Sequence, residues 1–239
     1  MEALADHLQR LYNLTINPTT VYRILKREGI RYGTHQPRTT KRWKKQLFAH
    51  QTPGLELQMD TKFPLGYKQG RVIYTVIDDA TRWVYAWTYT TANKENSLDF
   101  ITRVQQQAPF VIQKIRTDQG KEFRANVVRE YLAQQQIVHR LNTPYCPEEK
   151  GKIERFHRTL NEKCVVGMHP NDQLDTLQYK LTLFLQYYNW QKRHRGLGMD
   201  GVTPMQKLDS CAGGGWCLFL AAMLQTFTKV SRCCKTSTN

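Results

Sequence analysis

Residues 115–160 read IRTDQGKEFRANVVREYLAQQQIVHRLNTPYCPEEKGKIERFHRTL. This stretch places Asp118 at the end of an apolar run and Glu154 inside a helical pattern. A second run upstream, LELQMD at 55–60, ends at Asp60. Three carboxylates on three separate elements suggest a site for hard divalent cations, because oxygen ligands suit Mg²⁺. Two such ions can clamp the attacking and leaving oxygens of a phosphoryl transfer.

The composition is that of a globular protein with an excess of positive charge. Hydrophobic residues make up 40% and aromatic residues 11% of the 239 residues, enough for one mid-sized core and a small accessory domain. Lys and Arg number 35 against 20 Asp and Glu, which gives a formal charge of +15. This surplus favours a polyanionic partner such as nucleic acid, although basic ribosomal and membrane-surface proteins share it.

Neither a signal peptide nor a membrane span is expected. The first residues, MEALADH, lack the charged and apolar regions of a signal peptide. No stretch of the sequence reaches the roughly 20 apolar residues that cross a bilayer. We therefore expect a cytoplasmic protein with no membrane partner. None of the six cysteines forms a C-x-x-C pair, so reduced and unligated thiols are expected.

Two short helices are predicted within residues 1–33. Asn17 is expected to cap the second helix, with Pro18 at its first position and Gly29 at its end. The pair resembles a helix-turn-helix whose second helix enters the major groove, and an earlier helix of the motif is expected to be missing. Any two-helix hairpin with a solvated charged face has the same pattern. The residues of this helix expected to contact DNA are Tyr22, Arg23, Lys26 and Arg27.

Residues 34–53 are predicted to form a basic linker. Helical and strand periodicity are both lost here, and basic residues cluster around Trp43. A charge run is usually a solvated linker, yet basic residues interleaved with an aromatic also track a phosphate backbone. The candidates for DNA contact in the linker are Arg42, Lys44 and Lys45.

Residues 54–195 are predicted to fold as one α/β domain. The predicted elements are strands at 55–61, 72–77 and 83–89, a helix capped by Asn96, a strand at 111–117, a helix capped by Asn126 and a strand at 137–141. This order predicts a mixed five-stranded sheet flanked by helices. Ligands of such sheets gather beyond the carboxyl ends of the strands, where Asp60 and Asp118 lie.

A helix is predicted beyond the proline-containing loop at 142–151. Ile153, Phe156 and Leu160 form its buried stripe, and Glu154 lies at the edge of that stripe, where a carboxylate can lean toward the two aspartates. Basic residues on the same approach are expected to hold the phosphates beside a cleavage point. These residues are Lys150, Lys152, Arg155 and Arg158.

The remainder of the chain is predicted to contain one long helix, an arm and a tail. The helix is expected over 172–190, and the post-core arm occupies 196–208. Residues 209–239 change character, and their apolar run at 216–227 has no obvious partner element. We interpret this tail as foreign to the core, with an additional helix as the alternative.

Three motifs in order resemble the catalytic core of the retroviral-integrase-like family, in the version found in insertion-sequence DDE transposases. They are LQMD at 57–60, TDQGKEF at 117–123 and GKIERFHR at 151–158. Residues 119 through 153, which number 35, separate Asp118 from Glu154, and this spacing is associated with that superfamily. The segments YN at 188–189, RHR at 193–195 and TP at 203–204 are similar to the family's segment after the core.

The resemblance implies a ribonuclease-H-like fold with two Mg²⁺ or Mn²⁺ ions held by Asp60, Asp118 and Glu154. The implied chemistry is hydrolysis at the 3′ ends of a mobile element, followed by attack of the freed 3′-hydroxyl on a target duplex. DNA is thus the implied partner, at element ends and at the target. Joining two ends implies at least a homodimer, and a bacterial element implies a nucleoid-associated protein. The sequence departs from retroviral integrases in lacking their N-terminal His-His-Cys-Cys zinc module.

Other acids and histidines near the motifs are expected to be structural. Asp78 and Asp79 fall in a predicted hairpin turn, and Glu122 is expected to flank a helix. His139 and His157 are expected to pack or to face solvent rather than to bind metal. Two alternative functions remain open at this point: a ribonuclease-H-type nuclease acting on RNA–DNA hybrids, and a catalytically inactive remnant that binds element ends.

Overall fold

The computed structural model describes residues 2–30, 50–66, 70–143 and 150–211. The chain divides into two compact units, Met1–Lys45 and Gln46–Asn239. The linker candidates Arg42, Lys44 and Lys45 lie outside the described residues, as does most of the predicted tail. Within the described residues, no helix is both long and apolar enough to cross a membrane.

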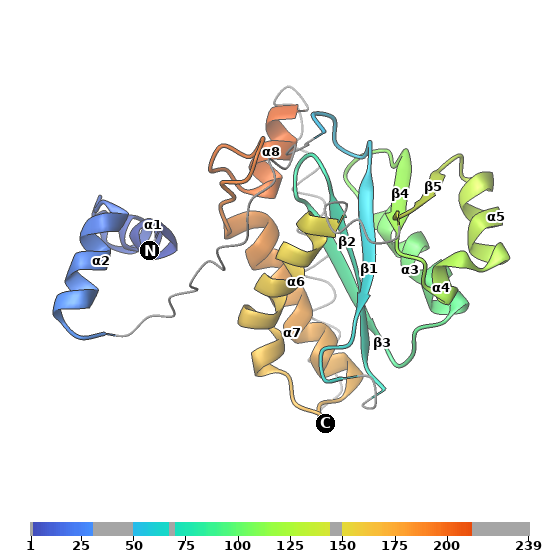
Figure 1. The fold of residues 1–239 in the computed structure, drawn as a ribbon, viewed down its shortest axis with the longest axis horizontal. Coiled ribbons are helices and arrows are strands. Elements are labelled where there is room, and N and C mark those ends of the chain that lie inside the picture. The colour runs from blue at the N-terminus through green and yellow to red at the C-terminus, as the bar shows by residue number, and fades with distance from the viewer. Residues whose placement is uncertain (1, 31–49, 67–69, 144–149, 212–239) are drawn as a thin grey trace, which may run out of the picture. The chain divides into compact units, whose positions relative to one another are not determined.

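The described part of the first unit consists of two helices, α1 (Glu2–Tyr12) and α2 (Pro18–Arg27), drawn in blue in Figure 1. Asn17 caps α2, because its side-chain oxygen accepts a hydrogen bond from the Thr19 amide at 2.9 Å. Gly29 follows the helix with a φ of 66°, a left-handed conformation that suits glycine. The predicted cap and end of this helix are therefore confirmed.

The described residues of the first unit bury little apolar surface. Ala5 and Val21 are its buried apolar side chains among the described residues. Leu11, Tyr12 and Leu14 are 62%, 65% and 50% exposed. The two helices therefore contribute only a small core of their own, since the hydrophobic contribution scales with the apolar area that is buried.

The second unit is built on a mixed five-stranded sheet in the order β3-β2-β1-β4-β5 (Figure 1). Its strands are β1 (Leu57–Lys62), β2 (Val72–Asp78), β3 (Val84–Tyr89), β4 (Lys114–Thr117) and β5 (Val138–Leu141). Strand β2 pairs antiparallel with β1 and β3, whereas β4 pairs parallel with β1 and β5. The predicted α/β class with a mixed five-stranded sheet is confirmed.

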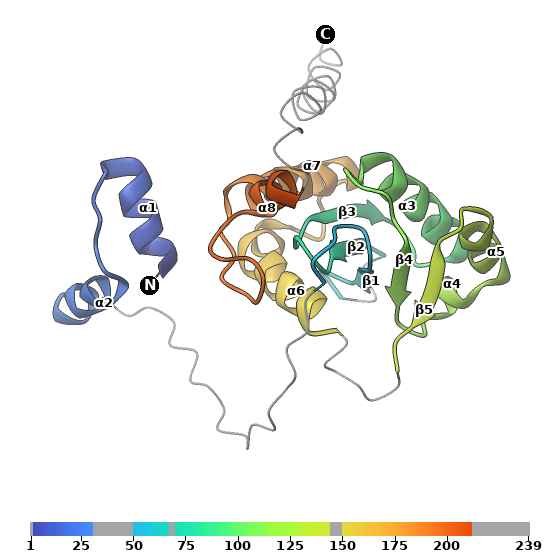
Figure 2. The ribbon, with the colours of Figure 1, turned by 90° about the horizontal axis from the view of Figure 1, so that it is seen from above.

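Helices cover both faces of this sheet (Figures 1 and 2). The helices in chain order are α3 (Lys94–Gln107), α4 (Lys121–Arg124), α5 (Asn126–Gln134), α6 (Gly151–Lys163), α7 (Leu174–Gln186) and α8 (Pro204–Cys211). A short 3-10 helix, η3 (Val165–Gly167), follows α6, and a π-helical turn, η4 (Tyr187–Gln191), continues α7. One core joins α3, α4, α5 and α8 to the sheet, and a second joins α6 and α7 to its other face.

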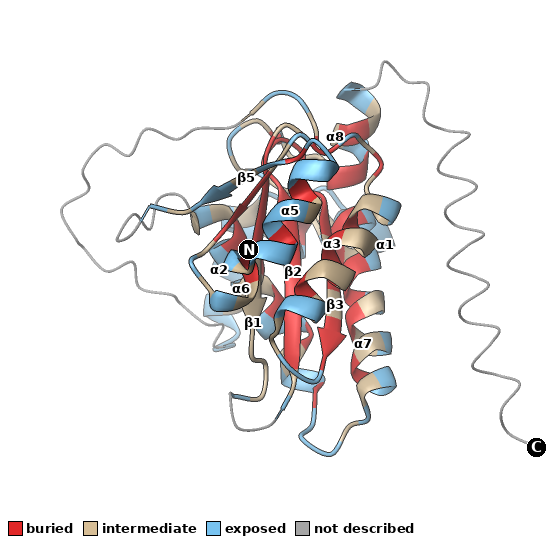
Figure 3. Ribbon diagram, turned by 90° about the vertical axis from the view of Figure 1, so that its right-hand side faces the viewer, coloured by how far each residue is buried: buried red, intermediate tan, exposed pale blue. Residues whose placement is uncertain are grey.

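Alternate residues of β2 supply the two cores. Tyr74 and Val76 belong to the core that contains Phe100 of α3, whereas Ile73 and Ile77 belong to the other core. This alternation is the two-residue period of a strand. Every residue of β2 is buried, as expected for a central strand covered on both faces, whereas β5 is largely exposed at the sheet edge (Figure 3).

Two predicted helix caps are wrong. Asn93 rather than Asn96 caps α3, because its side chain accepts a hydrogen bond from the Asn96 amide at 2.8 Å. Asn96 lies inside the helix, and its own side chain donates to the Thr91 carbonyl. Asn126 is the first residue of α5, and Ala125 takes the cap position without a side-chain bond. The short helix α4, which the sequence pattern did not indicate, ends immediately before this position.

Most predicted strands start one or two residues too early, and two predicted elements differ more from the observed ones. Strand β4 begins at Lys114 instead of residue 111, because Val111 is 82% exposed and the Gln113 amide bonds the Gly54 carbonyl instead of a strand. The predicted helix at 172–190 is divided into α7 and the π-helical turn η4. The extra residue of a π turn re-aims the side chains that follow it.

Candidate active site

Asp60 and Asp118 lie side by side on neighbouring strands. Strands β1 and β4 run parallel, with Leu57 opposite Ile115 and Gln58 opposite Arg116. The same offset places Asp60 level with Asp118, which directly follows β4. The two motifs are therefore brought together by strand register.

Lys150 lies between these two carboxylates. Its ammonium nitrogen is 3.5 Å from Asp118 Oδ2 and 4.0 Å from Asp60 Oδ2. The side chains of Asp60, Asp118 and Lys150 are 15%, 32% and 28% exposed. One cation is thus shared by two partly buried acids, and it marks the point where positive charge is stabilised.

Each aspartate is oriented by a backbone amide. The Thr61 amide donates to Asp60 Oδ1 and the Gly120 amide donates to Asp118 Oδ1, both at 2.9 Å. The Oδ1 atoms are therefore held by the backbone, and the two Oδ2 atoms face the shared cation. Fixed carboxylates of this kind lose little conformational freedom when they bind an ion.

The pKa of Asp60 is strongly shifted. Burial raises the pKa of its carboxyl to about 6, and the negative charges of Asp118 and Glu154 push it in the same direction. The positive charge of Lys150 and the bond from Thr61 lower this pKa and so oppose the rise. A shifted carboxyl beside other acids is typical of functional sites.

Glu154 lies near this pair without joining it. It is exposed on α6, and its charge acts on Asp60. Within the described part of the chain, no three His, Cys, Asp or Glu side chains are close enough to hold a metal ion together. Lys150, the N-cap residue of α6, contacts the two aspartates, and Glu154 lies four residues later in the first turn of the helix. The structure thus gathers two of the three expected acids and leaves the third beside them.

The donor set fits a hard divalent ion at the two aspartates. Both supply carboxylate oxygens, which Mg²⁺ and Mn²⁺ prefer, and one or two carboxylates are the usual protein share of a Mg²⁺ site. The ammonium of Lys150 already shows that the position favours a cation. Asp60 and Asp118 are therefore the residues that can hold a metal here, with Glu154 within electrostatic reach.

Two histidines are hydrogen-bonded, each through a threonine hydroxyl, to the backbone carbonyls of the two aspartates. The Thr75 hydroxyl donates to the Asp60 carbonyl at 2.9 Å and lies 2.7 Å from His157 Nε2. Because a threonine hydroxyl has one hydrogen, His157 Nε2 must be the donor to Thr75. Burial lowers the pKa of His157 to about 3, so the ring is neutral. This chain of bonds ties α6 to the backbone of Asp60.

The same arrangement recurs at Asp118. The Thr117 hydroxyl donates to the Asp118 carbonyl at 2.9 Å and lies 3.0 Å from His139 Nε2. Burial lowers the pKa of His139. The expectation that both histidines pack is confirmed, but the sequence did not reveal their links to the two aspartates. Those links join residues distant in sequence, such as Thr75 and His157, so no local pattern signals them.

Asp78 and Asp79 fix the turn between β2 and β3. Asp78 accepts hydrogen bonds from the Gly54 amide at 2.9 Å and from the Thr81 amide at 2.8 Å. Asp79 forms an ion pair with Lys152 and accepts from the His50 amide at 3.0 Å. The structural role expected for the two aspartates is confirmed. Lys152, expected at the phosphates, uses its ammonium in this turn instead.

Glu122 lies in the first turn of α4. A Cβ atom added to Gly120 would approach the Glu122 carboxylate oxygens to within 2.8 Å, so this carboxylate lies against Gly120. Its charge also helps to raise the pKa of the buried Tyr74 hydroxyl, after the larger effect of burial. Glu122 therefore lies inside a short helix instead of flanking the predicted one at 126, because α4 precedes that helix.

The remaining candidates for DNA contact are exposed on two helices. Arg155 and Arg158 are exposed on α6, the helix of Glu154. The four candidates on α2 are exposed as well, and they are Tyr22, Arg23, Lys26 and Arg27. Their contacts with DNA remain predictions.

The π-helical turn η4, which follows α7, is hydrogen-bonded to strand β3. The Asn189 side chain accepts from the Val84 amide at 3.0 Å and donates to the Val84 carbonyl at 2.8 Å, so it continues the sheet edge at β3. The Tyr188 ring packs against Phe156 at 5.0 Å and against His194 at 4.7 Å between centroids. The similarity noted at 188–195 therefore has a structural basis in this packing.

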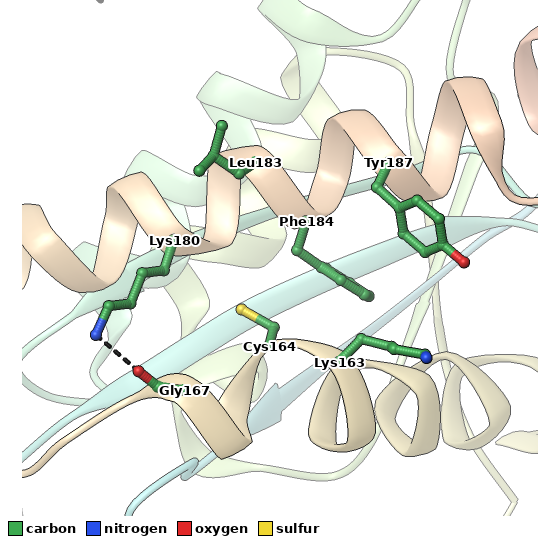
Figure 4. A pocket seen from close by; sticks show the side chains of 7 residues that line it. All are labelled: Lys163, Cys164, Gly167, Lys180, Leu183, Phe184 and Tyr187. Carbon is green, nitrogen blue, oxygen red and sulfur yellow. Dashed lines mark hydrogen bonds between the residues drawn. The ribbon is translucent and has the colours of Figure 1, made fainter. Parts of the chain in front are cut away.

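A pocket of about 570 Å³ lies apart from the acids, between the end of α6 and α7 (Figure 4). Its lining consists of Lys163, Cys164, Gly167, Lys180, Leu183, Phe184 and Tyr187. Lys180 donates to the Gly167 carbonyl at 2.7 Å across one end. No acid lines this pocket, so it is separate from the site of Asp60 and Asp118.

Two family models, both described as integrase core domain, match the chain at residues 50–147 and 135–204. ORF3 of Spiroplasma virus SpV1-C74, an integrase by name, is 27% identical over 174 residues, which are 64% of this chain and 47% of that protein. The Pol polyprotein of equine infectious anemia virus (isolate 1369) is 31% identical over 137 residues, which are 57% of this chain and 11% of the polyprotein. The chain thus spans about half or less of the length of these relatives.

Solved structures share the fold at lower identity. The catalytic core domain of BIV integrase aligns with a TM-score of 0.53 at 23% identity, over 66% of this chain and 95% of that one. A simian T-cell lymphotropic virus intasome in complex with PP2A regulatory subunit B56 gamma aligns with a TM-score of 0.58 at 18% identity, over 80% and 66%. The sheet is therefore the ribonuclease-H-like sheet of retroviral integrase cores. With two matching models that together span residues 50–204, the chain belongs to the integrase core domain family.

Proposed function

We propose that this protein is a DDE transposase or integrase that cleaves DNA 3′ ends and joins them to a target duplex with the help of divalent metal ions. The observation that carries the proposal is the pair Asp60 and Asp118, which converge on one cation in an integrase core domain. The formal charge of +15 supports a polyanionic substrate.

Asp60 and Asp118 would hold Mg²⁺ or Mn²⁺, with Glu154 as the third ligand and two ions in the complete site. Bound ions supply activation of the attacking hydroxyl and neutralisation of charge at the scissile phosphate. The Thr61 and Gly120 amides keep the two aspartates oriented before substrate arrives. Arg155 and Arg158, exposed on the helix of Glu154, would bind backbone phosphates and fix the register of the duplex.

The proposed partner is DNA, at element ends and at the target. The basic exposed face of α2 supports recognition of the ends by the first unit. Joining two ends to one target needs two active sites, so we propose at least a dimer on DNA. A relative solved as an intasome supports an assembled complex of this kind. Such a protein would work at the nucleoid of a bacterial host.

The proposal is tested with Asp118→Asn and purified full-length protein on oligonucleotides that carry the element ends. We expect the parent to cleave and join these ends with Mn²⁺, and the variant to lose at least about a hundredfold of both activities. Binding of the same DNA should change by less than about threefold, because Asn keeps the size of Asp and this residue is proposed to hold metal, not DNA.

The matched control is Asp175→Asn, which removes an exposed acid from the first turn of α7. It should leave both activities unchanged. A parent that binds the ends but cleaves nothing with Mn²⁺ would support the inactive remnant instead. A parent that cleaves an RNA–DNA hybrid in preference to duplex DNA would support the nuclease.

A further inference from the structure

Lys150 occupies the space into which the two aspartates direct their available oxygens. The Oδ1 atoms of Asp60 and Asp118 accept backbone amides, so the Oδ2 atoms remain for a ligand. Lys150 Nζ lies 3.5 Å and 4.0 Å from those two Oδ2 atoms. A divalent ion bridging the aspartates would need the same oxygens, and an ammonium and a metal ion cannot share them.

We propose that Lys150 acts as an internal competitor for the metal site: its ammonium holds Asp60 and Asp118 together in the metal-free protein and must withdraw as a divalent ion binds. The inference rests on the proposed function, since it concerns the same two aspartates. It adds a residue that sets how readily the site takes up its ion.

Lys150 is placed so that it can withdraw without disturbing the fold. It is the residue before the first helical residue of α6, and its side chain makes no capping hydrogen bond. Its side chain is 28% exposed, and a Cβ atom added to the neighbouring Gly151 would meet nothing within 4 Å. A lysine stem is flexible, so the ammonium can move into solvent by rotations about its own bonds.

Withdrawal of Lys150 would also make room for Glu154. Lys150 is the N-cap residue of α6, and Glu154 lies four residues later in the first turn of that helix. The charge of Glu154 acts on Asp60, yet its carboxylate does not join the aspartates into a group of three within the described residues. When a divalent ion replaces the ammonium, the Lys150 side chain leaves the space between Asp60 and Asp118. The positive charge of the ion then attracts the carboxylate of Glu154.

The released ammonium would then be available to a DNA phosphate. DNA and metal would both favour the withdrawn state of Lys150, so each should strengthen binding of the other. Lys150 is thus a positioning residue that couples metal uptake to the arrival of substrate.

The test measures Mn²⁺ binding to the full-length protein by electron paramagnetic resonance, without DNA. We expect Lys150→Gln to bind Mn²⁺ about tenfold more tightly than the parent, because a competing positive charge is gone. Lys150→Arg keeps the charge and should bind no more tightly than the parent. The control Lys163→Gln removes an exposed charge from the other end of α6 and should bind as the parent does.

A second measurement adds duplex DNA. Mn²⁺ affinity of the parent should rise with DNA, and that of Lys150→Gln should rise less. Thermal unfolding of each variant verifies that it is folded. If the parent binds Mn²⁺ and folded Lys150→Gln binds it equally well or more weakly, the inference about Lys150 is wrong. The proposed metal site would then still stand. Absence of Mn²⁺ binding from the parent and from Lys150→Gln would overturn the proposed function and this inference together.

Discussion

Opposing influences act on the ionisation of the Asp60 carboxyl. Burial and two neighbouring acids oppose its ionisation, whereas Lys150 and one amide favour it, and the balance raises its pKa to about 6. Asp118, more exposed and on the next strand, faces the same cation. A carboxylate whose ionised form is disfavoured by its surroundings gains more from binding a cation. The burial that lowers the stability of the protein with ionised Asp60 therefore favours binding of the proposed metal ion.

Asp60→Asn should therefore stabilise the metal-free protein at neutral pH. The folded protein holds the proton of Asp60 up to a pKa of about 6, whereas the unfolded chain releases it near 3.8. The native state binds more protons in this window, so the parent loses stability as pH rises from about 4 to about 6. At pH 8 we expect Asp60→Asn to be more stable by about 1 to 3 kcal/mol, the upper value being the full shift at 1.36 kcal/mol per pKa unit.

Urea unfolding in the presence of EDTA checks this difference at several pH values. The gap between the two proteins should close as pH falls below about 4, where both side chains are neutral. A variant that is less stable than the parent at pH 8, or a gap that does not change with pH, would contradict this account of Asp60.

At the scale of elements, the site depends on loops that hold the strands in register. Gly54, just before β1, accepts a hydrogen bond from the Gln113 amide just before β4. Its amide also donates to the side chain of Asp78, the last residue of β2. Gly54 thus links the segments that precede β1 and β4 to the end of β2.

Gly54→Ala should destabilise the core by at least about 3 kcal/mol. Gly54 has a φ of 77°, and an added Cβ would fall on the Val111 carbonyl and within 2.8 Å of the Phe110 ring. The matched variant is Gly201→Ala, with a φ of 79° and nothing within 4 Å of the added Cβ. It carries the backbone strain alone and should cost about 1 to 2 kcal/mol. Chemical denaturation measures both, and equal losses would show that the close approach at Gly54 is unimportant.

Elements with a local signal could be predicted from the sequence, and those without one could not. The start of α2 at Asn17-Pro18 and the buried strand β2 each depend on residues that are adjacent in the sequence. Both predictions are confirmed. Asn93 and Asn96 offer the same capping chemistry three residues apart, and only the start of α3 decides between them. A helix boundary of this kind is set by tertiary packing, which local propensity does not contain.

The same limit applies to the site. Three acids in order identified the family, and strand register brings two of them together as expected. The position of Lys150 between Asp60 and Asp118 depends on strands and a helix that meet only in the fold. Sequence spacing shows which residues share an element, but it does not show which side chain lies between the Asp60 and Asp118 carboxylates. The sequence therefore predicts Glu154 at the position where Lys150 lies.

At the scale of the whole molecule, the positive charge is divided between the two units. Residues 1–45 hold ten Lys and Arg against three Asp and Glu, which is a net +7 of the total +15. Among the described residues, the first unit buries few side chains of its own, whereas the second contains both large cores. The division favours a first unit that contributes to DNA binding and a second that contributes the fold and the chemistry.

Removal of residues 1–45 should therefore weaken DNA binding without unfolding the core. At about 0.15 M salt we expect the affinity for element-end DNA to fall at least about tenfold. The slope of log affinity against log salt concentration should become shallower by about 3, because each lost phosphate contact contributes about 0.9 to that slope. Titrations by fluorescence anisotropy at several salt concentrations measure both. The thermal midpoint of the core should stay unchanged, and an unchanged salt dependence would assign the DNA contacts to the second unit instead.

We propose that Asp60 and Asp118 hold the divalent ions that act on DNA. Anomalous X-ray scattering from crystals of the protein grown with Mn²⁺ locates such ions. We expect a manganese peak between the Asp60 and Asp118 carboxylates, with the Lys150 ammonium withdrawn from them. Manganese bound only elsewhere, or an Asp60–Lys150–Asp118 cluster that persists at saturating Mn²⁺, would contradict it.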